Sequence, residues 1–273
     1  MTPEINEAKI SVNNLTVSYI DEGPDKAPVI IFIHGFPLNK FMWSKQIEAL
    51  TDKYRVIAYD IRGHGNSEAG EEKFAIDLFA NDLVGLMDAL KIEKAMLCGL
   101  SMGGYIAIKA ILSHPERFSS IILSDTSCKA DTPEGKEKRL NAIENIAKNG
   151  VENYAEESLK KLFAIESFTT NREEIAFARQ MIVKTSKQSL YNTLRALADR
   201  KETCGHLQDI NVPVLIMVGK EDVITPLEAA MFMHEKIKDS ILQIIGHAGH
   251  LSNMENPGEY NDKLRKFIPS VIS

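Results

Sequence analysis

Residues 95–113 read AMLCGLSMGGYIAIKAILS, and this stretch decides the fold. An apolar run typical of a buried strand is followed by a helical pattern from Met102 to Ser113. Between them lies a GxSxG pattern centred on Ser101, in the strand–turn–helix setting of a nucleophile elbow. A side chain at Gly99 or Gly103 would collide with neighbouring backbone. We therefore predict a tight, strained turn that presents a serine.

The same turn also predicts that the surroundings of Ser101 favour negative charge. The serine would sit at a helix N-terminus, where free N–H groups and the helix dipole favour a developing oxyanion. GxSxG alone is a weak signal, and a purely structural glycine-rich turn is the alternative. A serine hydroxyl is a poor nucleophile at neutral pH, so an enzyme would need a base elsewhere in the chain.

Further apolar runs continue the strand–helix alternation on both sides of this turn. The segment 9–21 alternates about an Asn-Asn pair and predicts an N-terminal hairpin. Continuous apolar runs at 28–35, 54–60, 119–125 and 212–222 fit strands buried on both faces of a parallel sheet. Helical patterns lie between most of them. The fold class is therefore α/β, with helices covering both faces of the sheet.

The alternation stops between residues 129 and 203, where charged, helix-favouring stretches replace the strands. We predict a core domain made of residues 1–128 and 204–273 and an all-helical insertion, 129–203, that forms a lid or a packed lobe. Apolar residues of the insertion could line an acyl pocket, although residues at helical spacing more often pack a lobe. These are Leu162, Phe163, Phe168, Met181 and Leu194.

Composition excludes several function classes. The net charge is −6 and no basic stripe is present, so nucleic acid is not an expected partner. The longest apolar run is too short to span a bilayer, so no membrane partner is expected. The first ten residues carry no secretory pattern, which makes the cytoplasm the default compartment. Three cysteines without CxxC spacing argue against a disulfide framework and a zinc site, and we expect buried thiols and no metal.

His250 is the preferred base among seven histidines. It follows Gly249 in a loop after a strand, where an imidazole can be exposed. Asp222 follows the strand 212–219 and is the preferred acid to orient that imidazole. Glu221, its neighbour, and Asp125, at the end of another strand, are the alternatives. The other six histidines are not candidates for the base. We expect structural roles for His34, His64, His114 and His247, and we assign no role to His206 and His234.

An oxyanion hole needs two backbone donors. The N–H of Met102 follows the nucleophile directly, and the N–H of Phe36 lies in the loop after an earlier strand. Gly35 lets that backbone approach a ligand closely, and His34 is expected to brace the loop. In the next loop, Asp60 and an arginine are expected to hold loops by charge-assisted hydrogen bonds.

With these residues in place, the chain resembles a serine α/β-hydrolase with a helical cap, over nearly its full length. The resemblance implies a mostly parallel sheet of eight strands, with the cap between strands six and seven, and the chain order Ser101, Asp222, His250. Within the family it is most similar to small bacterial carboxylesterases and 3-oxoadipate enol-lactonase-like proteins. Serine rather than aspartate as nucleophile argues against haloalkane dehalogenases and epoxide hydrolases. The matching motifs are HGF at 34–36, DIRGHGNS at 60–67, GLSMGG at 99–104, GKED at 219–222 and GHAGHLSNMENP at 246–257.

The sequence thus predicts a carboxylesterase-type serine hydrolase that cleaves small esters or lactones through an acyl-enzyme, without a cofactor, as a monomer or homodimer. A C–C bond hydrolase, a lyase or a perhydrolase could use the same triad. The insertion lysines Lys160, Lys161 and Lys184 bear on that choice only if one lies over Ser101. A ligand-sensing protein that keeps the triad is the alternative from a different class.

Overall fold

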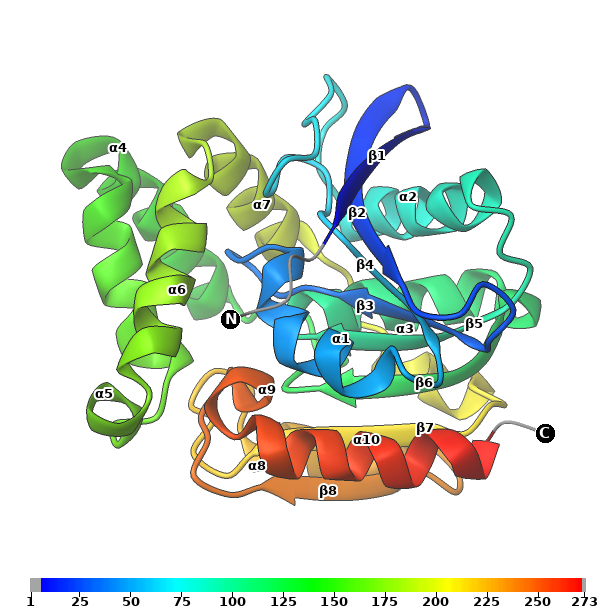
Figure 1. Ribbon diagram of the computed structural model, residues 1–273. Coiled ribbons are helices and arrows are strands. Elements are labelled where there is room, and N and C mark those ends of the chain that lie inside the picture. The colour runs from blue at the N-terminus through cyan, green and yellow to red at the C-terminus, as the bar shows by residue number, and fades with distance from the viewer. Residues whose placement is uncertain (1–5, 272–273) are drawn as a thin grey trace.

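A computed structural model describes residues 6–271 of the chain (Figure 1). Eight strands form one sheet in the order β1-β2-β4-β3-β5-β6-β7-β8. The pairs β1/β2 and β2/β4 are antiparallel, and all the other pairs are parallel, as expected. The strands are β1 (Glu7–Val12), β2 (Leu15–Glu22), β3 (Val29–Ile33), β4 (Arg55–Tyr59), β5 (Ala95–Leu100), β6 (Phe118–Ser124), β7 (Val214–Gly219) and β8 (Ile241–Ile245).

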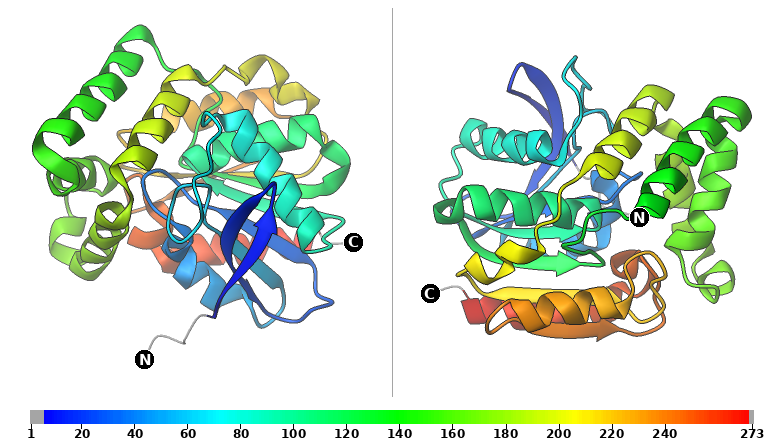
Figure 2. Two further views of the ribbon diagram at one scale, coloured as in Figure 1. Left: turned by 90° about the horizontal axis from the view of Figure 1, so that it is seen from above. Right: turned by 180° about the vertical axis from the view of Figure 1, so that it is seen from behind.

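Helices cover both faces of this sheet. The helices α1 (Ser44–Leu50) and α10 (Pro257–Val271) pack on one face, and α2 (Ile76–Ala89), α3 (Met102–Ser113) and α8 (Leu227–Lys236) pack on the other (Figure 2). Successive residues of β3 point to opposite faces: Ile31 joins the core under α2 and α3, and Phe32 joins the core under α1 and α10. This two-sided burial explains why the central strands are continuously apolar.

The N-terminal hairpin forms as the alternating pattern predicts. Asn13 and Asn14 connect β1 to β2 with φ of 49° and 62°. Asparagine tolerates this left-handed conformation better than most residues, so an Asn-Asn pair suits a two-residue hairpin turn. The hairpin lies at one edge of the sheet and contributes Glu7 and Ser18 to a buried polar network described below.

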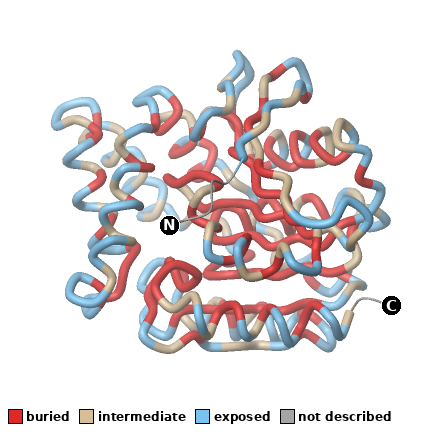
Figure 3. Tube along the Cα trace, in the orientation of Figure 1, coloured by how far each residue is buried: buried red, intermediate tan, exposed pale blue. Residues whose placement is uncertain are grey.

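Between β6 and β7 the chain forms the helices α4 (Pro133–Leu162), α5 (Ser167–Thr170), α6 (Arg172–Lys184) and α7 (Lys187–Asp199), which confirms the position of the all-helical segment. We call residues 129–203 the helical insertion and propose that it forms a cap domain on the core made of 1–128 and 204–273. Helix α4 is kinked at Gly150, which has a φ of 88°, so its two halves form a bent pair. The insertion stands beside the sheet in Figure 1, and its outer faces are exposed in Figure 3.

Short elements complete the fold. These are the 3-10 helices η1 (Lys40–Trp43), η2 (Pro115–Arg117) and η3 (Cys204–Asp209) and the helix α9 (Ser252–Glu255). The carboxyl ends of parallel strands meet at one edge of a sheet, where ligands of such folds bind. Here the loops that follow β3, β5, β7 and β8 carry the candidate functional residues.

Candidate active site

Ser101 lies on the turn between β5 and α3, with φ 55° and ψ −114°. A Cβ atom on Gly99 would lie 2.3 Å from the carbonyl oxygen of Gly103, and one on Gly103 would lie 2.1 Å from that of Ile33. Glycine is therefore required at both positions by close backbone approach, as the sequence predicts. The turn holds a non-glycine residue in a left-handed conformation, which is a strained arrangement typical of functional sites.

His250 and Asp222 form a buried pair. The Nδ1 atom of His250 lies 2.8 Å from Oδ2 of Asp222. Thr225 donates to the same carboxylate from its hydroxyl, at 2.7 Å, and from its backbone N–H, at 3.0 Å. The backbone N–H of Ile224 donates to Oδ1 at 2.8 Å. Asp222 is thus fixed by the turn that follows it, and within residues 6–271 the Nε2 atom of His250 has no hydrogen-bond partner.

The two groups shift one another's pKa. Burial acts to raise the pKa of Asp222, but the charge of His250 and the hydrogen bonds outweigh burial, so this pKa is lowered. Burial acts to lower the pKa of His250, but attraction to Asp222 outweighs it, so the pKa of His250 is raised. An imidazole that holds a proton more readily than usual suits a group that must accept one.

The loop of His250 differs from the expected exposed loop, because His250 is only 1% exposed. The helical insertion covers and holds this loop. Glu255 accepts hydrogen bonds from the N–H of Gly249, at 2.8 Å, and from the N–H of Ala164 in the insertion, at 2.7 Å. The N–H of Leu251 also donates to the carbonyl of Leu162 in the insertion, at 3.1 Å.

The expected oxyanion donors lie on two neighbouring loops. Met102 is the first residue of α3, and Phe36 lies in the loop after β3. In residues 6–271 neither backbone N–H donates a hydrogen bond to another part of the chain. A Cβ atom on Gly35 would lie 3.4 Å from Cβ of Ser101, so the loop packs directly against the elbow at this residue. Both donor loops therefore meet beside Ser101.

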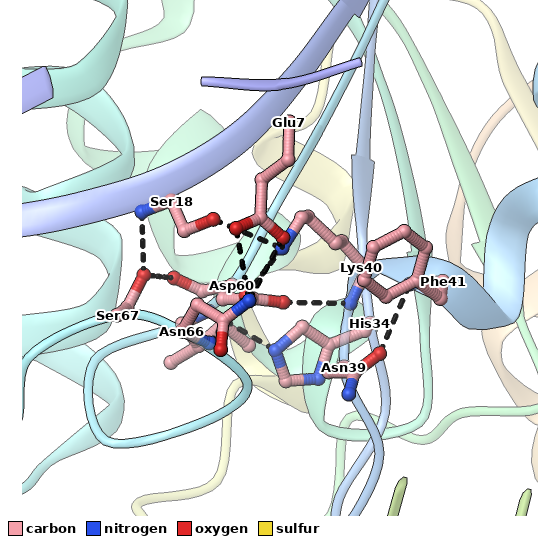
Figure 4. A network of polar contacts seen from close by, with 10 residues as sticks. Glu7, Ser18, His34, Asn39, Lys40, Phe41, Asp60, Asn66 and Ser67 are labelled. Carbon is pink, nitrogen blue, oxygen red and sulfur yellow. Dashed lines mark hydrogen bonds and ion pairs between the residues drawn. The ribbon is translucent and has the colours of Figure 1, made fainter. Parts of the chain in front are cut away.

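Two buried residues, His34 and Lys40, fix the loop after β3 (Figure 4). The Nε2 atom of His34 accepts a hydrogen bond from the N–H of Ile61 at 3.0 Å, and burial holds the pKa of His34 well below its usual value. The ammonium of Lys40 is fully buried and lies 2.6 Å from Asp60 and 2.7 Å from Glu7. The backbone N–H of Lys40 also donates to Asp60, at 2.9 Å. Sequence reasoning expected Asp60 to hold loops but missed Lys40, because lysine is rarely buried unless paired.

A cavity of about 560 Å³ lies between the elbow and the helical insertion. Ser101 and His250 both line it, together with the oxyanion candidates Phe36 and Met102. In residues 6–271 no hydrogen bond joins Ser101 to His250. Catalytic hydrogen bonds are often long or poorly aligned in a free enzyme and tighten when substrate binds, so the two side chains remain candidates for one site. The cavity brings together predicted residues from three different loops, and Asp222 lies behind His250 on a fourth.

The insertion contributes polar rather than purely apolar walls to this cavity. Of the apolar residues expected there, Leu162 and Leu194 line the cavity. Phe163 and Met181 pack in the core, and Phe168 is 41% exposed. The charged residues that line the cavity are Asp131, Lys138, Arg139, Glu157 and Lys161.

Asp131 lies between two arginines at this wall. Arg139 binds both of its oxygens, and Arg200 donates to it at 2.6 Å. Burial acts to raise the pKa of Asp131, but the two guanidinium groups outweigh burial and lower it. Arg200 also stacks over the ring of Tyr105, which lines the cavity, at 4.5 Å from the ring centre. Asp131 is therefore an ionised carboxylate whose charge is more than offset by its partners.

The interpretation of the cysteines was wrong for two of the three. Cys128 and Cys204 form a disulfide that joins the two ends of the helical insertion. Their separation of 76 residues gives no sequence signal of pairing. Cys98 is the buried thiol that was expected, and burial raises its pKa to about 12.

In residues 6–271 no cluster of histidine, cysteine, aspartate or glutamate is arranged to hold a metal ion.

Residues 28–257 match the model of the alpha/beta hydrolase fold family. The chain belongs to this family. It is 33% identical over 257 residues to 3-oxoadipate enol-lactonase 1 of Acinetobacter baylyi, covering 94% of each chain. It is 29% identical over 252 residues to enol-lactonase 2 of the same organism, covering 92% of each chain.

Solved structures agree with this membership of the alpha/beta hydrolase family. A thermophilic esterase from Thermogutta terrifontis, with malate bound, superposes with a TM-score of 0.92 at 32% identity, covering 98% of this chain and 100% of the esterase. The enol-lactonase from Burkholderia xenovorans LB400 gives a TM-score of 0.90 at 26% identity, covering 96% and 100%. The family likeness supports hydrolysis of esters or lactones at the level of the family.

Within residues 6–271, no helix combines the length and apolar character needed to cross a bilayer.

Proposed function

We propose that this alpha/beta hydrolase is a serine hydrolase that cleaves small carboxylic esters or lactones through an acyl-enzyme. The observation that carries the proposal is the convergence of Ser101 and His250 on one cavity, with Asp222 hydrogen-bonded to His250 at 2.8 Å. The esterase and enol-lactonase relatives support the same class of substrate. Needing only side chains and water, the reaction requires no cofactor.

In the first half of the reaction, Ser101 Oγ attacks the carbonyl carbon while Nε2 of His250 takes the hydroxyl proton. The N–H groups of Phe36 and Met102 stabilise the negative oxygen of the tetrahedral intermediate. Asp222 accepts the hydrogen bond from Nδ1 and stabilises the imidazolium. When the carbon–oxygen bond breaks, His250 gives its proton to the leaving alkoxide and the acyl group stays on the serine.

In the second half, a water molecule attacks the acyl-enzyme and gives its proton to His250. The tetrahedral intermediate forms on the same two backbone donors and collapses to release the carboxylic acid. His250 then returns the proton to Ser101 Oγ, so that the enzyme is regenerated. For a lactone the alcohol and the acid remain one molecule, and the net reaction is addition of one water.

Rapid-quench mass spectrometry with 4-nitrophenyl acetate and butyrate tests the proposal. We expect a burst of 4-nitrophenol, an acyl mass increment on the peptide that contains Ser101, and steady turnover without added metal or partner. Turnover without an acylated serine peptide would contradict the mechanism. Product analysis on ester, lactone and 1,3-diketone panels, with and without peroxide, separates ester hydrolysis from C–C cleavage, lyase and perhydrolase chemistry. A single turnover that needs a partner protein would favour a ligand sensor.

The cavity wall favours a substrate that carries a carboxylate away from the scissile bond. Three cationic residues, Lys138, Arg139 and Lys161, line the cavity against two acidic ones, Asp131 and Glu157. Arg200 lies behind the wall and also pairs with Asp131, and within residues 6–271 Lys138 and Lys161 have no ion-pair partner. The wall is positive although the whole chain has a net charge of −6. The names of two similar proteins point the same way, because one acts on an enol-lactone of 3-oxoadipate and the other holds malate.

A matched pair of substrates tests the charge preference. The 4-nitrophenyl monoester of glutaric acid and 4-nitrophenyl pentanoate have acyl chains of the same length, and only the first ends in a carboxylate. We expect a higher kcat/KM for the half-ester at low ionic strength and a smaller advantage in salt, because salt screens the attraction. A higher kcat/KM for pentanoate at low salt would contradict the preference.

A further inference from the structure

The segment 124–126, at the carboxyl end of β6, forms hydrogen bonds to both the N–H and the carbonyl of Ser101. The N–H of Ser101 donates to the carbonyl of Ser124 at 3.0 Å, and the hydroxyl of Thr126 donates to the carbonyl of Ser101 at 2.8 Å. The backbone of the strained serine is therefore held by the segment 124–126 as well as by its own helix, whose residues Gly104 and Tyr105 donate to the same carbonyl.

Asp125, the middle residue of this segment, contacts the other two loops. Its Oδ1 accepts a hydrogen bond from the N–H of Gly219 at 2.7 Å, three residues before Asp222. Its Oδ2 accepts one from the hydroxyl of Ser252 at 2.5 Å, two residues after His250. One carboxyl group thus joins the loop that carries the acid to the loop that carries the base.

Two features make Asp125 unlike an ordinary structural residue. It is fully buried, and in residues 6–271 no lysine, arginine or histidine lies within 4.0 Å of its carboxylate. A buried carboxylate without a cation costs free energy that a neutral asparagine or serine would not. Its φ is 44°, so it shares with Ser101 a left-handed conformation that is sparsely populated outside glycine.

We propose that Asp125 is a positioning residue of this hydrolase, whose carboxylate holds the loops of Asp222 and His250 in register with the elbow of Ser101 and whose charge favours the imidazolium of His250. The inference rests on the proposed function, since it assigns how the three groups of that site are kept together. Sequence reasoning placed Asp125 as an alternative acid. The contacts assign it to the loops rather than to the imidazole, which is bound by Asp222.

The charges around His250 give the electrostatic part of the inference. Carboxylates from three elements face the imidazole: Asp222, Asp125 and Glu255 all act to raise the pKa of His250. Burial, followed by repulsion from Asp222, raises the pKa of Asp125 itself to about 7, and attraction to His250 opposes this. Replacing Asp125 by a neutral residue removes the negative charge that its ionised form places near the imidazole. The pKa of His250 is then expected to fall.

The decisive variant is Asp125→Asn, which keeps the size of the side chain and a carbonyl oxygen for the N–H of Gly219. We expect kcat to fall about 10- to 100-fold through misplacement of the imidazole, with a small change in KM. We also expect the acidic limb of the kcat/KM profile to move to lower pH by roughly half a unit. Ser252→Ala breaks the contact to the base loop and keeps the charge. It should lower kcat by a smaller factor without moving the limb.

Asp82→Asn is the matched control. Asp82 is a buried carboxylate that pairs with Arg62, away from the three loops, so its loss lowers stability without touching the site. Its kcat should stay near wild type well below its melting temperature. An Asp125→Asn enzyme that is folded by circular dichroism and keeps the wild-type kcat and pH profile would overturn the inference. If Asp125→Asn does not fold, a Ser252→Ala enzyme with wild-type kcat does the same.

Failure of the proposed function gives a different result. In that case the wild-type chain neither turns over esters nor forms an acylated serine. The positioning role is then tested by NMR titration of the His250 ring, identified by comparison with His250→Asn. A lower pKa in Asp125→Asn than in wild type supports the inference, and an unchanged pKa contradicts it.

Discussion

The α/β core and the helical insertion differ in what they contribute to the same cavity. The core supplies Ser101 and His250 to the cavity, with Asp222 behind His250, from loops at the carboxyl ends of strands, where backbone and side-chain contacts fix each group. The insertion supplies a wall with five charged side chains, four of them from α4 and the fifth, Asp131, from the segment just before it. A rigid scaffold with a separate, more polar wall allows the wall to vary without disturbing the chemistry.

The two regions are nevertheless connected at the loop that carries His250. Glu255 is buried and accepts hydrogen bonds from Ala164 and Ser167 of the insertion and from Gly249 beside His250. Displacement of the insertion would therefore move the base loop. On the proposed function, changes in the cavity wall could alter selectivity without moving the catalytic groups, whereas changes at Glu255 would also move the loop of His250.

The largest loss of activity is expected when the proposed nucleophile of the core, Ser101, is replaced. Ser101→Ala should reduce kcat/KM for 4-nitrophenyl butyrate by at least about 10³-fold, because the serine, base and acid act as a unit. The melting temperature should change little. Ser113→Ala, on the exposed end of the same helix, should keep wild-type activity. Near-normal turnover by Ser101→Ala would place the chemistry elsewhere.

The acid should have the next largest effect. Asp222→Asn should lower kcat on the order of 10³-fold, because the imidazole loses the partner that fixes its tautomer and stabilises its cation. Glu221→Gln, which changes the neighbouring exposed carboxylate, should leave kcat within about 2-fold of wild type, as for surface substitutions away from a site. Equal losses in the two variants would contradict the assignment of the acid.

The pH dependence should follow His250. Its pKa is raised, because Asp222 outweighs the burial that acts to lower it, and only the neutral imidazole can accept the serine proton. As pH falls through this pKa, kcat/KM should drop about 10-fold per unit, since one protonation removes the base. We expect the midpoint to lie above 6.5, the value of an ordinary histidine. A midpoint at or below that value would argue against His250 as the base.

The disulfide should matter for the stability of the insertion more than for the core chemistry. It closes a long segment, so Cys128→Ser combined with Cys204→Ser should lower the free energy of unfolding by about 2–4 kcal/mol. The melting temperature should fall by roughly 4–16 °C. Dithiothreitol should lower the melting temperature of the wild type and leave that of the double variant unchanged. An equal melting temperature in reduced and oxidised wild type would show that the link adds no stability.

The smallest expected effect concerns the wall. Lys161 lines the cavity and Lys160, its neighbour, does not. Lys161→Gln should lower the preference for the glutarate half-ester over pentanoate roughly 2- to 5-fold, the effect of one exposed ion pair. Lys160→Gln should keep the wild-type ratio. Identical ratios in both variants would remove Lys161 from substrate recognition.

Local patterns predict the core of this molecule well, because strand and helix periodicity and the steric needs of Gly99 and Gly103 are properties of neighbouring residues. The features that sequence missed are long-range. Cys128 and Cys204 are brought together only by the geometry of β6 and η3, and Lys40 is buried only because Asp60 and Glu7 converge on it.

The sequence predicts that the insertion is helical, but it does not predict which of its residues face the cavity. Five apolar residues were candidates, and only Leu162 and Leu194 reach the cavity. The kink at Gly150 rotates the second half of α4 relative to the first, and no periodicity within either half encodes that rotation. Which face of an amphipathic helix meets a ligand depends on packing against distant elements, whereas the pattern reports only that two faces differ.

The link between Cys128 and Cys204 also has a consequence for engineering. Their Cα atoms are 4.9 Å apart, about the spacing of adjacent strands, so the chain leaves the core and returns to it at nearly one point. A short turn could bridge that gap without moving β6 or η3. The segment between the two cysteines can therefore be treated as an exchangeable module, into which helices from another family member could be grafted at two fixed junctions.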